Sequence, residues 1–199
     1  MKDILKKSGK KFTVLEGDGA FYGPKVDILM TDSMGREWQM GTIQLDMQMP
    51  LRFGLKYTDE NNKEQTPIVI HRVIYGSLER FIGILLEHTN GRLPTWLAPI
   101  QVRILSFTDR NIDYARQIIK RIGNEMPELR MDADLRSTTI PAKVKEAEIM
   151  RVPYIIVVGD KEEKDKSLAV RIRGDKNIIS LKADDFIRKI KDEIVNRKS

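Results

Sequence analysis

The chain has 199 residues, of which 41% are hydrophobic and 32% are charged, and its net charge is +6. It has no apolar run near the length of about 18 residues that a membrane-spanning helix needs, and its charged N-terminus lacks the apolar centre of a signal peptide. The absence of cysteine excludes disulfides and thiolate metal sites, and it favours a cytoplasmic protein. The basic excess lies mainly in the second half. This permits nucleic-acid binding, although a solvated lysine-rich surface is the more common explanation.

The stretch "RLPTWLAPIQ" separates two groups of predicted elements. Gly91 is a helix stop signal, and Pro94 and Pro99 lie on either side of Trp96 before a new β pattern begins. We therefore expect one domain over residues 1–98 and a second over residues 99–199.

The first group predicts antiparallel strands followed by one long helix, which is an α+β order. A short helix over residues 2–7 comes first. A turn at 33–35 joins two segments that alternate well enough to pair as a hairpin. The long helix is expected from Arg72 to Glu87. Strands are expected over residues 11–17, 26–32, 66–71 and within 32–49.

The second group alternates strands with helices and predicts an α/β domain with a mixed sheet flanked by helices. Its last two strands pair through "GDKN", which adds an antiparallel hairpin. One helix carries a clear apolar stripe, made by Ile112, Ala115, Ile118, Ile119 and Ile122. The expected strands cover 101–107, 129–135, 152–160, 168–173 and 177–181, and the expected helices cover 110–126, 140–151 and 182–197.

The helix predicted within "HRVIYGSLERFIGIL" combines an apolar face with a second, unusual face. Gly76, Arg80 and Gly83 share that second face, although a glycine inside a helix costs about 1 kcal/mol relative to alanine. One interpretation is tight helix–sheet packing, with Arg80 paired to an acid. The other is a smooth floor for a phosphorylated ligand, with Arg80 as a fork for anionic oxygen. The expected core face consists of Ile74, Leu78, Phe81, Ile82 and Leu85.

Two further stretches are candidates for a binding site. The loop "EGDGAFYGPKVD" either packs its aromatics inward or brings its backbone to a ligand, with Tyr22 and Lys25 in the site. In "WQMGTIQLD", Thr42 and Gln44 share one strand face because side chains alternate with a period of two. Gln39 and Gln44 either face solvent or bind an amino acid or a base.

Histidine occurs only at positions 71 and 88. A lone histidine is usually structural, but His71 lies at a predicted strand–helix junction. A zinc site needs three or four ligands, and the chain has no cysteine to add. The sequence therefore does not build a zinc site by itself.

Read together, "EGDGAFYGPKVD", "WQMGTIQLDMQMP", "IVIHRVIYGSLERFIGILLEH" and "LPTWLAP" resemble the C-terminal part of the threonyl-tRNA synthetase family. "ADLR", "VPYIIVVGDKE" and "LAVRIR" extend the resemblance through the second half. It implies part of an α+β class II synthetase catalytic domain, with a mostly antiparallel sheet and the motif 3 helix, followed by an α/β anticodon-binding domain. It also implies ATP-dependent activation of threonine to threonyl-adenylate and transfer of threonine to tRNA(Thr).

The resemblance assigns four residues to ATP, which binds with Mg²⁺ as a substrate. Arg80, within "GSLER", corresponds to the motif 3 arginine that holds ATP phosphate, and it is the expected catalytic residue. Ser77 lies one turn earlier, beside the nucleotide. Lys25 and Gln39 correspond to residues near ATP.

The resemblance also implies a threonine pocket. Tyr22 and Gln44 would line it, and His71 corresponds to one of three protein ligands of a zinc ion that holds the amino and hydroxyl groups of threonine. Valine has the same shape as threonine but lacks the hydroxyl. A site that must pair with the hydroxyl therefore rejects valine far better than an apolar pocket does.

In the second domain, Arg151, Glu162 and Arg171 correspond to residues that read the anticodon. Arginine planes and carboxylate acceptors suit unstacked RNA bases. Ser137 departs from the family pattern, which usually has asparagine after "DLR". Because the serine hydroxyl has less reach than an asparagine amide, the resemblance supports an anticodon contact at Ser137 less well than at the other three positions.

Several family parts are missing from this sequence: motif 1, which forms the dimer interface, motif 2, two zinc ligands and the editing region. We therefore expect a fragment that is inactive alone, whose parent enzyme is a homodimer and whose partner is the missing N-terminal half. A tRNA-binding accessory protein is the alternative. A synthetase for proline or histidine fits "GTIQLD" and "IHRVIYGSLERF" less well.

Overall fold

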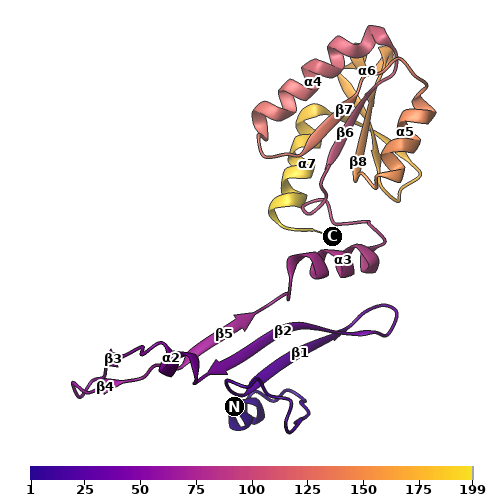
Figure 1. Ribbon diagram of the computed structural model, residues 1–199. Coiled ribbons are helices and arrows are strands. Elements are labelled where there is room, and N and C mark those ends of the chain that lie inside the picture. Colours follow the sequence, from indigo (N-terminus) through magenta and orange to yellow (C-terminus); the bar gives the residue numbers. More distant parts are fainter. Residues whose placement is uncertain (199) are drawn as a thin grey trace. The chain divides into compact units, whose positions relative to one another are not determined.

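The computed structural model describes residues 1–198, and the chain divides into two compact units between His88 and Thr89. Figure 1 shows both units, which are described separately below. This division comes before the predicted boundary at residue 98. Among the described residues, no helix is long and apolar enough to cross a membrane.

A three-stranded antiparallel sheet forms the centre of the first unit, in the order β1 (Lys25–Thr31), β2 (Glu37–Asp46), β5 (Val69–Val73). The predicted hairpin is confirmed. Its turn is closed by the Asp32 carboxylate, whose Oδ1 accepts hydrogen bonds from the backbone N–H groups of Met34 and Arg36, each at 2.9 Å. Local side chain-to-backbone bonding of this kind is why aspartate favours turns.

The remaining elements of the first unit are short, except for one helix. Helix α1 (Lys2–Lys7) is confirmed, but the strand predicted over residues 11–17 is wrong, because these residues form no strand. A small hairpin was not predicted from the sequence, and neither was a one-turn helix. These elements are α2 (Met49–Arg52), β3 (Tyr57–Thr58) and β4 (Glu64–Gln65).

The long helix, α3 (Leu78–Thr89), begins six residues later than predicted. Residues from His71 to Val73 pair with β2 instead, and Gly76 lies in the connecting turn with φ +65°. The prediction that Gly76 shares a helix face with Arg80 and Gly83 is therefore wrong, because Gly76 precedes the helix. The predicted burial of the apolar face is also wrong. No α3 residue is buried, and Leu78 is 62% exposed.

The second unit contains the predicted mixed sheet flanked by helices. Its five strands lie in the order β10 (Ile178–Lys182), β9 (Ser167–Ile172), β8 (Tyr154–Val158), β6 (Val102–Ser106), β7 (Met131–Asp134). Strand β6 is parallel to β7 and β8, whereas β9 is antiparallel to both β8 and β10.

Helices cover both faces of this sheet. Figure 1 shows α4 (Ile112–Glu125) and α7 (Ala183–Val195) on one side and α5 (Ile140–Ile149) on the other. Two short helices, η1 (Asp109–Asn111) and α6 (Asp160–Asp165), follow the carboxyl ends of β6 and β8. Of these elements, the sequence did not predict α6.

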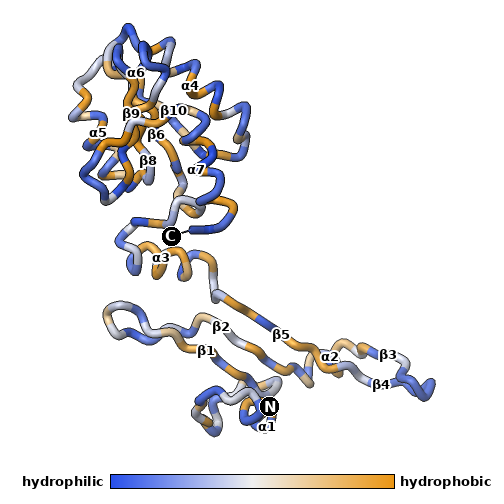
Figure 2. The backbone as a smooth tube through the Cα atoms, turned by 180° about the vertical axis from the view of Figure 1, so that it is seen from behind, coloured by the Kyte–Doolittle hydropathy of each residue, from blue (hydrophilic) through white to orange (hydrophobic). Residues whose placement is uncertain are grey.

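Burial in the second unit follows the two helical layers. The larger core lies under α4 and α7 and includes Ile118, Ile122 and Phe186, each at most 5% exposed. The smaller core lies under α5 and includes Leu105 and Ile155. Figure 2 shows hydrophobic residues concentrated on the central strands, whereas the helices alternate between polar and apolar residues, as amphipathic helices do.

Candidate functional site

A β-bulge places the polar residues of β2 on one face of the first sheet. Asp27 pairs with Thr42, but Leu29 pairs with Gln39, so that β2 has one extra residue between these pairs. Without this bulge, Gln39 and Gln44 would point to opposite faces, because side chains alternate along a strand. The bulge therefore brings Gln39 to the same face as Thr42 and Gln44.

Four side chains form a connected group at one end of this face. Gln44 pairs directly with His71 of β5, and its Oε1 accepts a hydrogen bond from the Tyr22 hydroxyl. The Tyr22 ring meets the His71 ring edge to face, with 5.9 Å between the centroids. His71 Nε2 lies 3.1 Å from Asp46 Oδ2. The structure thus brings together the three residues predicted at the threonine and zinc sites, and it adds Asp46.

Asp46 is the buried member of this group and is fixed by backbone hydrogen bonds. Its side chain is buried, and its Oδ1 accepts the backbone N–H groups of Gln48 and Met49 at 3.0 and 2.9 Å. Burial raises the pKa of the Asp46 carboxyl. The hydrogen bonds from the Met49 N–H and the His71 ring together outweigh the effect of burial, so the pKa of Asp46 lies below its ordinary value. Asp46 was not predicted from the sequence, although it is two residues after Gln44 on the same strand face.

The lowered pKa of Asp46 predicts a specific acid sensitivity. A carboxyl whose pKa is lower in the folded state stabilises the fold fully above its unfolded pKa of about 3.9, and this contribution disappears as the pH falls through the folded pKa. We expect the stability difference between the parent chain and Asp46→Asn to shrink as the pH falls below about 4. Urea unfolding of both proteins between pH 3 and pH 6 measures this, and a difference that stays constant would contradict it.

Lys25, Asp27 and Gln39 form a second polar group on the same face. Lys25 Nζ lies 2.8 Å from Asp27 Oδ2, and Gln39 Nε2 donates to Asp27 Oδ1 at 2.8 Å. The hydrogen bond to Asp27 raises the pKa of Lys25, so the ammonium stays charged. Asp27, which was not predicted as a site residue, thus orients both residues predicted near ATP.

The glycine-rich loop before β1 is held against β2. A Cβ at Gly23 would lie 2.0 Å from the carbonyl oxygen of Leu45. The backbone N–H of Met47 donates to the Tyr22 carbonyl at 3.1 Å, which fixes the loop on the end of β2. The predicted close approach of this loop is therefore made to the protein's own backbone, and it positions Tyr22.

Replacing Gly23 with alanine is expected to push this loop away from β2. The clash is with backbone, so relief requires a shift of the strand or the loop, which costs about 1–3 kcal/mol for an overpacked site. The separation of Tyr22 from Gln44 should appear as a change in the Tyr22 ring signals in NMR spectra. Gly19→Ala is the matched control in the same loop, because a Cβ there would approach other atoms no closer than 3.4 Å, an ordinary van der Waals contact. Unchanged Tyr22 signals in the Gly23→Ala protein would contradict the prediction.

The start of α3 lies beside the bulged end of β2. A Cβ on Gly76 would lie 3.6 and 3.7 Å from the carbonyl oxygens of Met40 and Gln39. Ser77 Oγ accepts the backbone N–H of Arg80 at 3.3 Å. The Arg80 guanidinium is exposed and forms no ion pair with any described residue, so the acid expected for a purely packing role is not found.

The predicted anticodon residues occupy two ends of the second sheet. Ser137 follows β7 and Glu162 lies in α6 after β8, so both are at the carboxyl ends of the parallel strands. Arg151 precedes β8, and Arg171 pairs with Ile155 near the amino end of β8. The four residues therefore do not form one cluster. They are spread along a strand of five residues, a length of about 17 Å.

Two of these residues also have structural contacts. Glu162 Oε2 accepts the Gly159 backbone N–H at 3.0 Å and so caps the start of α6. Arg151 has a left-handed backbone with φ +58°, and its carbonyl accepts a hydrogen bond from Arg173 Nη1 at 2.7 Å. Arg173 was not selected from the sequence, although it is two residues after Arg171 and directly follows the end of β9.

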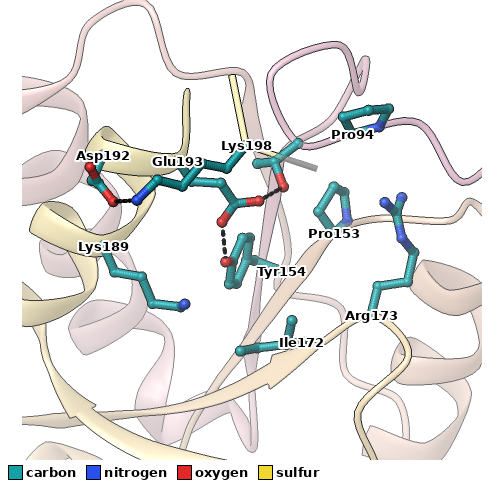
Figure 3. Close-up of a pocket in the computed structure, with 10 residues that line it drawn as sticks. Pro94, Pro153, Tyr154, Ile172, Arg173, Lys189, Asp192, Glu193 and Lys198 are labelled. Carbon is teal, nitrogen blue, oxygen red and sulfur yellow. Dashed lines mark hydrogen bonds and ion pairs between the residues drawn. The ribbon is translucent and has the colours of Figure 1, made fainter. Parts of the chain in front are cut away.

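A cavity of about 420 Å³ lies at the amino end of β8, and Figure 3 shows its lining. Glu193 is its central acceptor, with hydrogen bonds from the hydroxyls of Tyr154 and Thr95. Burial raises the pKa of Tyr154, and Glu193 raises it further. Arg173 also lines the cavity and donates to the carbonyl of Leu93. Within the second unit, these bonds hold Leu93 and Thr95 against Arg173 and helix α7.

The described residues do not by themselves provide the expected zinc site. No group of three His, Cys, Asp or Glu residues converges anywhere within residues 1–198. His71 is nevertheless arranged like a ligand. The Asp46 carboxylate only accepts hydrogen bonds, so in the neutral ring Nε2 carries the hydrogen and Nδ1 keeps its lone pair.

Comparisons with known proteins agree with this division of the chain. Residues 1–89 match the model of the tRNA synthetase class II core domain (G, H, P, S and T), and residues 101–193 match the model of the anticodon binding domain. The threonine–tRNA ligase of Desulforamulus reducens is 48% identical over 99% of this chain. The match covers 31% of that relative, so the chain spans about a third of its length.

Solved structures of synthetases also resemble the chain. The RNA binding domain of threonyl-tRNA synthetase from Cryptosporidium parvum is 38% identical with a TM-score of 0.86, over 96% of this chain and 48% of that one. The prolyl-tRNA synthetase of the same organism is 22% identical with a TM-score of 0.68, over 91% and 41%, and shows the fold alone. The chain therefore belongs to the threonyl-tRNA synthetase family of class II, of which it contains a core-domain segment and an anticodon-binding domain.

Proposed function

We propose that the chain serves a threonine–tRNA ligase, which activates threonine with ATP and Mg²⁺ and transfers it to tRNA(Thr) for cytoplasmic protein synthesis. The observation that carries the proposal is the shared face of β1, β2 and β5. It holds Lys25 and Gln39 in one group and Gln44 and His71 in another, with Tyr22 over the second. Relatives named threonine–tRNA ligase support the choice of amino acid.

In this proposal the two polar groups have different substrates. Lys25, held by Asp27, and Gln39 bind ATP, and Arg80 supplies a planar fork for phosphate oxygens from the adjacent start of α3. Ser77 shapes the first turn of that helix. Arg80 is the proposed catalytic residue, because charge on the phosphate oxygens shifts during adenylate formation and a fixed cation stabilises it.

Tyr22 and Gln44 are proposed to bind threonine, with His71 offering Nδ1 to Zn²⁺. A bound zinc ion would supply a Lewis acid that pairs with the threonine hydroxyl, which valine lacks. Since the described residues do not complete a zinc site, the chain alone should bind Zn²⁺ weakly. Calorimetric titration of Zn²⁺ into the parent chain and His71→Ala measures the contribution of this one ligand.

For the second unit we propose recognition of the threonine anticodon by Ser137, Arg151, Glu162 and Arg171. The basic charge of the chain supports attraction to the phosphates, and the relation to anticodon binding domains supports the site. The homodimer is likewise a proposal carried by the family, in which the dimer interface lies in motif 1.

Replacing Arg151 with alanine is expected to weaken tRNA(Thr) binding by about 1–3 kcal/mol, because an arginine that stacks on or bonds to a base contributes about this much. Fluorescence anisotropy with labelled tRNA(Thr) measures it. Arg116→Ala is the control, since Arg116 is an exposed arginine on α4, on the other side of the sheet. Equal effects of the two variants would count against the anticodon site.

A non-catalytic tRNA-binding accessory protein is the second candidate. The retained groups around Asp27 and Asp46 favour the ligase, because an accessory protein would not need either of them. Mixing the chain with the part of the relatives' sequence that it does not match, and measuring threonylation of tRNA, separates the two. Tight tRNA binding without threonylation in the mixture favours the accessory protein.

A further inference from the structure

An ion pair joins the last turn of α3 to the turn between β1 and β2. Arg36 directly precedes β2, and its Nη2 donates to Oε2 of Glu87, which lies two residues before the end of α3. Since no residue of α3 is buried, apolar packing does little to fix this helix. The turn at its start and the ion pair near its end therefore contribute much of what fixes its direction.

The Arg36 side chain is already held by the hairpin itself. Asp32 Oδ2 accepts hydrogen bonds from Arg36 Nε at 2.6 Å and from Trp38 Nε1 at 2.8 Å, and the Asp32 side chain is 5% exposed. The Arg36 guanidinium also lies over the Trp38 ring, 5.4 Å from its centroid. An exposed ion pair usually contributes little, because two flexible side chains must be ordered. Here one partner is ordered before the pair forms, so less entropy is lost.

Glu87 shares a face of α3 with Arg80. The two residues are seven positions apart, which is nearly two turns of a helix, so their side chains differ in direction by about 20°. Gly83 lies between them on the same side of the helix, and a Cβ there would meet no atom within 4 Å. The ion pair to Arg36 therefore turns the face that bears Arg80 toward the hairpin, with open space along that face at Gly83.

We propose that Asp32, Arg36 and Glu87 form a positioning network that sets the rotation of α3 and so holds Arg80 toward the ATP phosphates. The inference rests on the proposed function, in which Arg80 binds phosphate, and it adds three residues that have no assigned role there. None of the three is placed in contact with ATP. They act through Arg80, because a helix that turns about its axis moves the Arg80 guanidinium away from the phosphate oxygens.

A second exposed ion pair of the first unit provides the matched control. Lys56 pairs with Glu64 at the β3–β4 hairpin, and both side chains are more exposed than those of Arg36 and Glu87. Neither Lys56 nor Glu64 lies on α3, so breaking their pair removes a surface charge pair without releasing the helix. A purely stabilising role of the Arg36–Glu87 pair predicts similar effects of breaking either pair.

The test measures threonine-dependent pyrophosphate exchange by the chain mixed with the part of the relatives' sequence that it does not match. We expect Arg36→Ala and Glu87→Ala each to lower kcat/KM for ATP about tenfold and to leave the KM for threonine within about twofold of the parent value. Glu87→Gln keeps an oxygen acceptor for Arg36 and should recover most of the loss. Glu64→Ala should match the parent chain.

A double variant tests whether the two residues act through one contact. Arg36→Ala combined with Glu87→Ala should lower kcat/KM for ATP no further than either substitution alone. Amide exchange in β1 and β2 shows whether each variant keeps the hairpin. If Arg36→Ala loses it, Glu87→Ala and Glu87→Gln decide the question, because Glu87 lies outside the hairpin.

The positioning network and the proposed function fail in different ways. A folded Glu87→Ala protein that keeps the parent kcat/KM for ATP overturns the network, and so does one in which the parameters for ATP and threonine worsen equally. In both cases the exchange activity of the parent mixture still supports the ligase. If the parent mixture shows no exchange, the proposed ligase function fails, and the network fails with it.

Discussion

Replacing Phe186 with alanine is expected to lower the free energy of unfolding of the second unit by about 3–5 kcal/mol. Phe186 is fully buried, and its ring meets Tyr154 edge to face with 5.6 Å between the centroids. The substitution removes this contact and leaves a cavity between α7 and the sheet, so that Tyr154 loses the packing that holds its hydroxyl at Glu193. Urea denaturation followed by circular dichroism measures the loss.

The matched control for this prediction lies on the same helix. Val195 is 68% exposed, and Val195→Ala should change the unfolding free energy by less than about 0.5 kcal/mol. Amide exchange adds a control within the chain, because the strands of the first unit should keep their protection in Phe186→Ala. A loss below about 1 kcal/mol would show that the site collapses around the smaller side chain.

Replacing Arg173 with alanine is expected to destabilise the second unit by about 3 kcal/mol, since each of its two charged hydrogen bonds contributes about 1.5 kcal/mol or more. Those bonds hold the carbonyls of Arg151 and Leu93. Burial lowers the pKa of the Arg173 guanidinium below its ordinary value. The guanidinium still carries its charge at neutral pH, because arginine is always protonated in proteins. Affinity for tRNA(Thr) should fall as well, because Arg151 loses the contact that fixes its left-handed backbone.

Lysine separates the two roles of Arg173. Arg173→Lys keeps the charge but has no planar fork, so it reaches one carbonyl and should recover part of the stability. If Arg173 positions Arg151, adding Arg151→Ala to Arg173→Ala should weaken tRNA binding by less than Arg151→Ala does alone. Fully additive effects on tRNA binding would leave Arg173 with a structural role only.

The second unit was predictable because local patterns and tertiary packing agree there. The apolar stripe through Ala115, Ile118 and Ile122 is buried as expected, and strand–helix alternation gives parallel strands. Helix α6 was missed because its six residues, "DKEEKD", carry no apolar stripe and depend on the cap from Glu162. Such a short polar helix has no periodic signal in the sequence.

The first unit was harder to predict where two patterns overlap. "IVIHRVIYGSLERF" has apolar spacing that suits a helix, and the prediction extended that helix back to Arg72. The structure assigns His71 to Val73 to a strand, because pairing with β2 satisfies their backbone groups. Gly76 then provides the left-handed turn that the change from strand to helix requires.

The sequence by itself determined the family, the order of most elements and the residue types of the candidate site, because motifs and hydrophobic periods are local properties. Only the tertiary structure decided which of those side chains meet. The bulge in β2 turned Gln39 to the face of Gln44, and strand pairing placed His71 beside Gln44 and Asp46. Register and bulges depend on pairing between distant segments, so the sequence of one strand does not specify them.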